Sequence, residues 1–218
     1  MTGKPQICVI GLGKFGYNFG MALLKLDHQV IGIDMDQVSI QRAQSDFTQV
    51  YVADVSQKQV LEQIGFSDIT HVLISVGDSI STSAMVTMYL KEMGVPNIWV
   101  KAINEDHGKL LKKVGADDVI IPEHMAAELL ADRIDLPGII QRLPFDAEMA
   151  IREISIDSFS GKTLREIDLT NKFNCQVIAV RRNGKSGYRY IPKADDILNR
   201  GDSLIIIGSR DSLSAIDP

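Results

Sequence analysis

The sequence of 218 residues has little cysteine and no long apolar segment. Its two cysteines, Cys8 and Cys175, lie far apart and share no metal-ligand spacing, which argues against a disulfide or zinc framework and predicts two small buried side chains. No apolar run approaches the roughly 20 residues that a bilayer crossing needs. Residues 1–5 lead directly into a predicted strand rather than a signal sequence, so we expect a soluble, cytosolic protein.

An excess of positive charge is also missing. The 23 basic residues face 28 acidic ones, for a net charge of −5. Because a nucleic-acid binder is normally marked by a broad basic surface, we expect no nucleic-acid partner. Apolar residues make up 45% of the chain, and a chain of this length buries roughly 70% of the surface that its unfolded form exposes. The sequence therefore predicts a stable hydrophobic core.

Short aliphatic runs alternate with amphipathic segments from residue 6 to about residue 135, which is typical of a βαβ protein. The runs are almost continuously apolar, as strands covered by helices on both faces must be, and they predict a parallel sheet. Ser56 and Asn104 stand where helix N-caps are expected. The predicted strands are Ile7 to Ile10, Val30 to Ile33, Val50 to Val52, Val72 to Val76, Ile98 to Val100 and Val119 to Ile121.

The pattern changes after a predicted helix from Glu123 to about Asp135. Proline and glycine then interrupt the periodicity, and the following segment is rich in alternating β-type residues. We predict a Rossmann-like, doubly wound α/β domain over residues 1–135, a linker over 136–144 and a small α+β domain over 145–218. Its predicted strands are Ile151 to Ile156, Gln176 to Val180, Tyr188 to Ile191 and Ser203 to Ile207, with a hairpin turn over residues 183–187.

A glycine motif follows the first predicted strand and opens the first predicted helix. Gly11 permits a tight turn, Gly13 lets the backbone approach a pyrophosphate, and Gly16 allows close packing of helix and strand. Asp34 ends the second strand, 18 residues after Gly16, where it would accept hydrogen bonds from an adenosine ribose. A carboxylate repels a 2′-phosphate, so NADP is disfavoured relative to NAD, ADP or ATP. The alternative interpretation is a structural turn with a capping aspartate.

Other polar residues follow the same edge of the predicted sheet. Asp54 would lie beside the adenine, or simply at the entry of a helix. Lys14 and Lys101 would add positive charge near the phosphates, or be solvated. Glu123 would hold a divalent cation with a triphosphate, or serve only as a first-turn helix residue. The predicted nucleotide-binding residues are Gly11, Gly13, Lys14, Phe15, Gly16, Asp34, Met35, Asp54, Val55, Gly77, Lys101 and Glu123, with Glu123 as the metal ligand.

Catalytic residues are not evident. A dehydrogenase needs a proton-transfer residue near the nicotinamide, and the four histidines have no orienting partner in the sequence. We therefore expect a binding protein rather than an enzyme, and the alternative is an NAD-dependent oxidoreductase. A DNA-binding redox sensor would need a helix-turn-helix segment that neither end supplies. A basic cluster, Arg181, Arg182, Lys185 and Arg189, forms either a solvated hairpin or a site for an anionic ligand or partner.

The sequence resembles the cytosolic regulatory subunits of Ktr and Trk type bacterial potassium-uptake systems, whose domain pair is called RCK. The resemblance covers nearly the whole chain. It is based on the glycine motif with Asp34 and on three further blocks, which are residues 94–102 (GVPNIWVKA), 115–123 (GADDVIIPE) and 201–208 (GDSLIIIG).

The resemblance implies a non-enzymatic sensor. It implies a self-associated ring, typically an octamer, docked on a membrane potassium-translocating subunit and reshaped by ATP against ADP or NAD against NADH. Lys14 stands where relatives carry an arginine that reaches a neighbouring subunit's γ-phosphate, and Glu123 matches an acidic residue that holds Mg²⁺ or another cation with ATP. Some relatives bind cyclic di-AMP through an arginine that residues 168–175 lack, which makes this ligand doubtful here.

Overall fold

The computed structural model describes residues 6–77, 79–143 and 145–217. The expectations that concern residues 1–5 and residue 144 fall outside this range. The described residues form two compact units, which divide between Glu123 and His124. No described helix has the length and apolar character needed to cross a bilayer. Cys8 and Cys175 are both buried and unpaired, as predicted.

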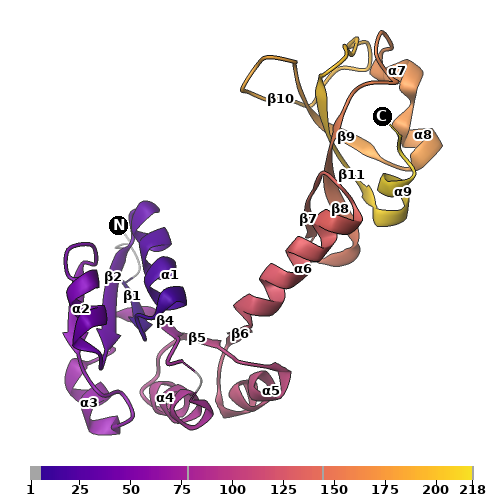
Figure 1. Ribbon diagram of the computed structural model, residues 1–218. Helices are drawn as coiled ribbons and strands as arrows, with labels where there is room; N and C mark the ends of the chain where they lie inside the picture. The colour runs from indigo at the N-terminus through magenta and orange to yellow at the C-terminus, as the bar shows by residue number, and fades with distance from the viewer. Residues whose placement is uncertain (1–5, 78, 144, 218) are drawn as a thin grey trace. The chain divides into compact units, whose positions relative to one another are not determined.

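Six parallel strands form the sheet of the first unit, in the order β3-β2-β1-β4-β5-β6 (Figure 1). This confirms the predicted Rossmann-like, doubly wound sheet, with small shifts at the strand ends. The strands are β1 (Gln6–Ile10), β2 (Gln29–Asp34), β3 (Gln49–Val52), β4 (Ile69–Ile74), β5 (Asn97–Lys101) and β6 (Asp118–Ile120).

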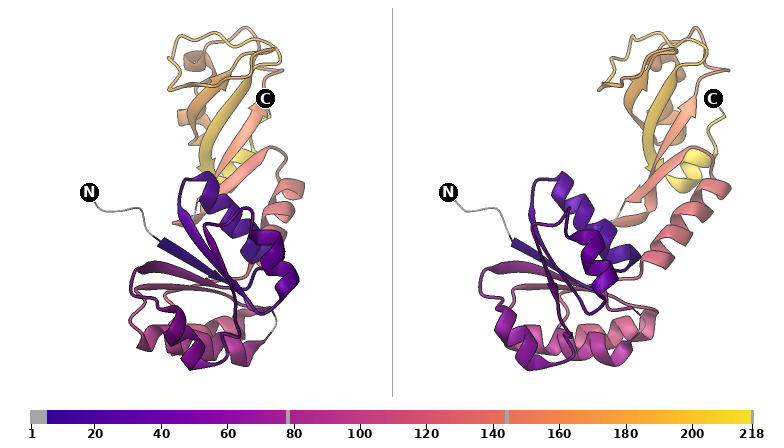
Figure 2. Two further views of the ribbon diagram at one scale, coloured as in Figure 1. Left: turned by 90° about the vertical axis from the view of Figure 1, so that its left-hand side faces the viewer. Right: turned by 60° about the vertical axis from the view of Figure 1, so that its left-hand side comes forward.

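Helices cover both faces of this sheet. Figure 2 shows α1 and α2, in indigo and violet, on one face and α3, α4 and α5 on the other. The larger core lies on the second face, where Ile10 and Ile98 pack with Leu61 and Leu90. Burying each such side chain stabilises the fold by roughly 1.5–3 kcal/mol. The helices are α1 (Lys14–Lys25), α2 (Gln37–Ala43), α3 (Lys58–Ile64), α4 (Ile80–Glu92) and α5 (Glu105–Val114).

One of the two predicted helix caps is correct. Asn104 caps α5, because its side chain accepts a hydrogen bond from the His107 N–H at 2.9 Å. The prediction for Ser56 is wrong, since α3 begins at Lys58 with Gln57 as its N-cap residue. The Ser56 hydroxyl instead donates to Asp54 at 2.7 Å.

The second unit is built on an antiparallel sheet in the order β10-β9-β11-β8-β7. Its core includes Ile154, Ile167, Leu204 and Ile206, which join the sheet to the short helices. The small α+β domain is thus confirmed. The elements are α6 (Pro122–Asp135), β7 (Ile139–Leu143), β8 (Asp146–Ser155), α7 (Leu164–Ile167), α8 (Leu169–Phe173), β9 (Gln176–Arg181), β10 (Arg189–Tyr190), β11 (Ser203–Ser209) and α9 (Arg210–Ser214).

The division between the units differs from the sequence prediction. Nearly all of α6 groups with the second unit, where Asp132 pairs with Arg142 and Arg210. Much of the predicted linker forms strand β7 rather than a free connection. Gly138 explains why the sequence pattern was interrupted before β7. Its φ of +87° forms a turn, and its carbonyl oxygen accepts a hydrogen bond from the Glu153 N–H at 2.8 Å.

Candidate functional site

A cleft of about 480 Å³ opens at the carboxyl ends of the parallel strands of the first unit. Its walls are the loops after β1, β2, β3 and β4 and the start of α4. The strand order reverses between β1 and β4, and open α/β sheets bind ligands at such a switch point.

The three glycines of the motif have different structural roles. Gly11 has a φ of +89°, and a Cβ there would lie 2.2 Å from the Ser75 carbonyl oxygen. A Cβ on Gly16 would lie 2.0 Å from the Gly11 oxygen. These two glycines are therefore required by the protein's own packing.

Gly13 has no such internal reason to be glycine. A Cβ there would meet no atom within 4 Å, its φ is an ordinary −61°, and Gly13 lines the cleft directly before α1. The open space lies at the amino end of a helix of 12 residues, where unpaired N–H groups favour an anion. The residues present thus fit a phosphate-bearing ligand.

Asp34 joins the end of β2 to the glycine loop. Its Oδ2 accepts the Leu12 N–H at 2.6 Å, and its Oδ1 accepts the Asp36 N–H at 2.8 Å. Each carboxylate oxygen has a further lone pair. Asp34 lines the cleft and is half-buried, so it can hold the loop and accept hydrogen bonds from ligand hydroxyls at the same time.

Asp54 lies after β3 on the same cleft wall. It accepts hydrogen bonds from the Ser56 hydroxyl at 2.7 Å, the Ser56 N–H at 3.0 Å and the Gln57 amide at 3.2 Å. These bonds, with the Ser56 hydroxyl first, lower the pKa of Asp54. Its carboxylate is therefore a charged acceptor at neutral pH.

The structure brings most of the predicted binding residues together. Gly77, with a φ of +64°, enters the cleft from the end of β4, and Met35, which is 74% exposed, forms part of its rim. The predicted residues that line the cleft are Gly11, Gly13, Asp34, Met35, Asp54, Val55 and Gly77.

Five predicted residues lie outside the cleft lining, namely Lys14, Phe15, Gly16, Lys101 and Glu123. Phe15 packs against Phe19, with ring centroids 6.3 Å apart. Lys14 is exposed at the start of α1. Lys101 pairs with Glu123, with 2.8 Å between Nζ and Oε1, so the two charges predicted to face a ligand face each other. The described residues contain no group of three or more potential metal ligands, and a cation at Glu123 stays a prediction.

Hydroxyl groups on the cleft wall were not predicted. Ser39, Ser75, Ser79 and Thr82 all line it. Ser79 caps α4 by accepting the Thr82 N–H at 3.3 Å. A serine directly before a helical segment is a recognisable N-cap signal, whereas Ser39 is brought to the cleft by tertiary folding.

No histidine lies among the described residues of the cleft lining. His107 is buried between α4 and α5, where its Nδ1 accepts the Ile103 N–H at 3.3 Å and its Nε2 lies 2.9 Å from the Ser83 hydroxyl. Burial lowers the pKa of His107. This histidine is a neutral packing residue.

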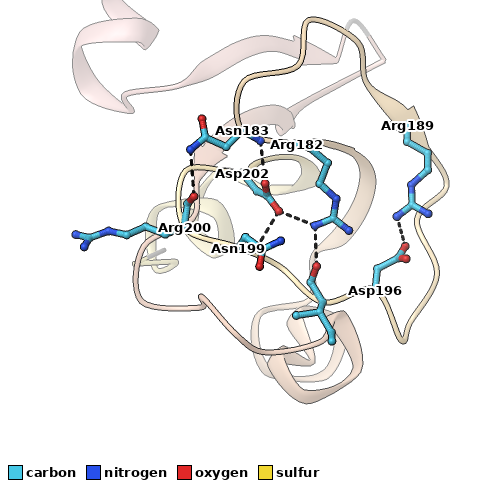
Figure 3. Close-up of polar contacts among 8 residues, drawn as sticks. Arg182, Asn183, Arg189, Asp196, Asn199, Arg200 and Asp202 are labelled. Carbon is cyan, nitrogen blue, oxygen red and sulfur yellow. Dashed lines mark hydrogen bonds and ion pairs between the residues drawn. The ribbon is translucent and has the colours of Figure 1, made fainter.

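The basic cluster of the second unit is engaged in structural contacts (Figure 3). Arg182 donates to Asp202 at 2.6 Å and to the Ile197 carbonyl at 2.7 Å. Asp202 is 1% exposed and also accepts the Asn183 and Asn199 N–H groups, both at 2.9 Å. The other two guanidinium groups are likewise paired, Arg189 with Asp196 and Arg181 with Glu153. The pairing of the three arginines argues against the anion-site alternative, and it shows them held in ion pairs rather than only solvated.

Comparison with known families gives a match over most of the chain. Residues 7–122 match the TrkA-N domain and residues 149–218 match the TrkA-C domain. Two relatives are similar over nearly their full length. They are the Ktr system potassium uptake protein C of Bacillus subtilis, 32% identical over 98% of this chain and 96% of the relative, and the Ktr system potassium uptake protein A of Vibrio alginolyticus, 30% identical with the same coverages.

Solved structures share the fold. The GsuK channel bound to NAD is 22% identical, with a TM-score of 0.57 over 96% of this chain and 37% of that chain. GsuK bound to ADP gives a TM-score of 0.52 over 60% of this chain and 34% of that chain, again at 22% identity.

Proposed function

This chain belongs to the TrkA family of potassium uptake proteins, defined by paired TrkA-N and TrkA-C domains, and we propose that it is a regulatory subunit. It binds an adenine nucleotide or dinucleotide in the cytosol and gates a membrane potassium-translocating partner. In the proposed form the chain assembles into an octameric ring. It is a regulator and not an enzyme.

The cleft of the first unit is the observation that carries this proposal. Gly13 leaves open space at the amino end of α1, and Asp34 and Asp54 line the same cleft. This is an arrangement for a phosphate beside α1 and for an adenosine between the carboxylates. The GsuK structures support it, because they are bound to NAD and to ADP and share this fold.

The nucleotide would regulate by differential binding. A ligand shifts a ring between two shapes only if it binds one of them more tightly. ATP differs from ADP by one phosphate, and Lys14 and Glu123 lie on the same edge of the sheet as the cleft but outside its lining. In the proposed mechanism these residues contact the additional phosphate, or a cation bound to it, across a subunit boundary. NAD against NADH is the second ligand pair that this cleft would distinguish.

The first test combines ligand-induced thermal stabilisation with the mass of the purified protein. ATP, ADP, NAD and NADH are compared with and without Mg²⁺, because a ligand that binds the native state raises stability by mass action. We expect a ring-sized assembly that at least one nucleotide stabilises. A well-folded sample that none of the four stabilises, and that carries no co-purified nucleotide, would contradict the proposal.

The second test concerns the residue that distinguishes ATP from ADP. In wild-type protein we expect ATP and ADP to give different ring shapes in small-angle X-ray scattering. Lys14→Ala removes an exposed charge without disturbing the core. We expect the two nucleotides to give the same shape in this variant. If the ring shapes with ATP and ADP still differ as in wild type, Lys14 is not the residue that distinguishes the two nucleotides.

A further inference from the structure

Leu12, in the middle of the glycine loop, is held on both sides through its backbone. Its N–H donates to Asp34 Oδ2 at 2.6 Å, and its carbonyl oxygen accepts a hydrogen bond from the Arg42 guanidinium. The Leu12 side chain is fully buried in the core beneath α1 and α2. Leu12 is thus held by the Asp34 carboxylate, the Arg42 guanidinium and the hydrophobic core.

The contact to Arg42 fixes more than Leu12. A peptide unit is planar and trans, so the carbonyl of Leu12 and the N–H of Gly13 point in opposite directions. Holding the carbonyl toward Arg42 therefore directs the Gly13 N–H away from Arg42. Gly13 lines the cleft and Arg42 does not. A hydrogen bond from a cation to the carbonyl also polarises the peptide and makes its N–H a stronger donor.

Arg42 is itself held in place. It lies near the end of α2, and its guanidinium carbon lies 4.3 Å from the centroid of the Tyr17 ring of α1, a cation–π contact. Tyr17 stacks on Phe47 at 5.8 Å, and its hydroxyl donates to Asp46 at 2.8 Å. These contacts fix the platform on which the guanidinium rests, although Arg42 is exposed.

We propose that Arg42 is a positioning residue for phosphate recognition, which aligns the Gly13 N–H from behind the loop without touching the nucleotide. The proposal rests on the proposed function of the cleft. The proposal predicts which ligands depend on Arg42. Loss of Arg42 should weaken ligands that carry phosphate and leave the adenosine half of the site unchanged.

The test compares ADP with adenosine as competitors of a fluorescent ADP analogue. Arg42→Met keeps an unbranched side chain over Tyr17 but removes the donors and the charge. We expect ADP to bind about five- to tenfold more weakly, which is less than the loss of more than about tenfold expected for a direct charge-assisted hydrogen bond, because Arg42 acts through the Leu12 peptide. We expect adenosine to bind as in wild type. Arg42→Lys, which keeps one donor group, should recover part of the loss.

The matched control is Arg165→Met. It makes the same change of charge at an exposed arginine of the second unit, 68% exposed and paired with Asp195. We expect it to bind both ligands as wild type does. Raised ionic strength tests for a general charge effect, because screening removes long-range attraction but not a fixed peptide orientation.

The outcomes separate the two proposals. If wild-type protein binds neither ligand, the proposed function fails and this inference fails with it. If wild type binds ADP and Arg42→Met binds it equally well, only the role of Arg42 is wrong. Equal weakening of ADP and adenosine, with a lower denaturation midpoint, would make Arg42 a structural residue. A loss of ADP binding that disappears at high salt would also overturn the positioning role.

Discussion

The cleft of the first unit and the Asp202 network of the second unit both place aspartates among backbone N–H groups, but they leave different space around them. Asp34 and Asp54 line an open cleft and are only partly buried. Asp202 is 1% exposed and is surrounded by Arg182, Asn183 and Asn199. The first arrangement leaves acceptors for a ligand, whereas the second uses them to hold loops.

This difference shows why charge in a sequence is a poor guide to a binding site. The clustered arginines of the hairpin left an anion site open as one of two alternatives, yet each guanidinium is paired with a carboxylate of the same unit. The candidate site of the first unit is instead marked by a glycine that has no packing partner. Unfilled space beside unsatisfied donors is the better indicator of a ligand.

The largest expected effect is on the closed network. Asp202→Ala leaves the Arg182 charge and two N–H groups without their acceptor. Breaking a buried pair costs about 3–5 kcal/mol, and we expect about 3 because the Arg182 side chain is 35% exposed. Chemical denaturation of the second unit measures this. Asp195→Ala, at a pair that is 81% exposed on the aspartate, is the control and should change the free energy of unfolding by less than about 1 kcal/mol.

The second effect compares two glycines of one loop. Gly16→Ala forces a Cβ to within 2.0 Å of the Gly11 oxygen and should lower the free energy of unfolding by about 1–3 kcal/mol. Gly13→Ala places its Cβ in open space and should leave stability unchanged or slightly raised. The denaturation midpoints of the two variants measure these changes in stability. Equal destabilisation by both substitutions would mean that Gly13 also serves packing.

The pH dependence of stability is the third effect. Burial raises the pKa of Asp202, but hydrogen bonds from Asn199, Asn183 and Arg182 outweigh it and hold this pKa below its ordinary value. A depressed pKa gives stability that is complete above the unfolded value of about 3.9 and is lost as pH falls through the folded value. The advantage of wild type over Asp202→Asn should therefore be constant near neutral pH and shrink below about pH 4. The denaturation midpoints of both proteins are measured across this pH range. A difference between wild type and Asp202→Asn that stayed constant down to low pH would contradict the account.

The smallest effect is expected at the edge of the sheet near the cleft. Lys101→Gln breaks the pair with Glu123, whose side chain is 66% exposed. Such pairs contribute about 0–1 kcal/mol, so we expect a change in the free energy of unfolding within that range. Lys58→Gln, which breaks the pair of Lys58 (41% exposed) with Glu92 (50% exposed), is the control at a more exposed lysine. A much larger loss for Lys101→Gln alone would show that this pair holds the sheet edge in the way that Asp202 holds its loops.

The sequence predicted the six parallel strands and the residues that sit at their ends, because both follow from local patterns. Gly13, Asp34 and Asp54 each lie at the end of an apolar strand or within three residues after it. The contacts between distant residues could not be predicted in this way. Arg42 reaches the carbonyl of Leu12, 30 positions away, and Asp202 meets Asn183 from 19 positions away. The pairing of Lys101 with Glu123 likewise depends on the neighbouring strands β5 and β6.

Calorimetric titration of ADP and NAD into wild-type protein, Gly13→Ala and Gly187→Ala tests the central claim most directly. Both glycines have open space at the position of a Cβ and no left-handed φ, but only Gly13 lines the cleft. We predict that wild type and Gly187→Ala bind at least one ligand equally, and that Gly13→Ala binds it at least tenfold more weakly, about 1.4 kcal/mol, with unchanged stability. Equal binding by all three proteins would place the nucleotide elsewhere and contradict the account.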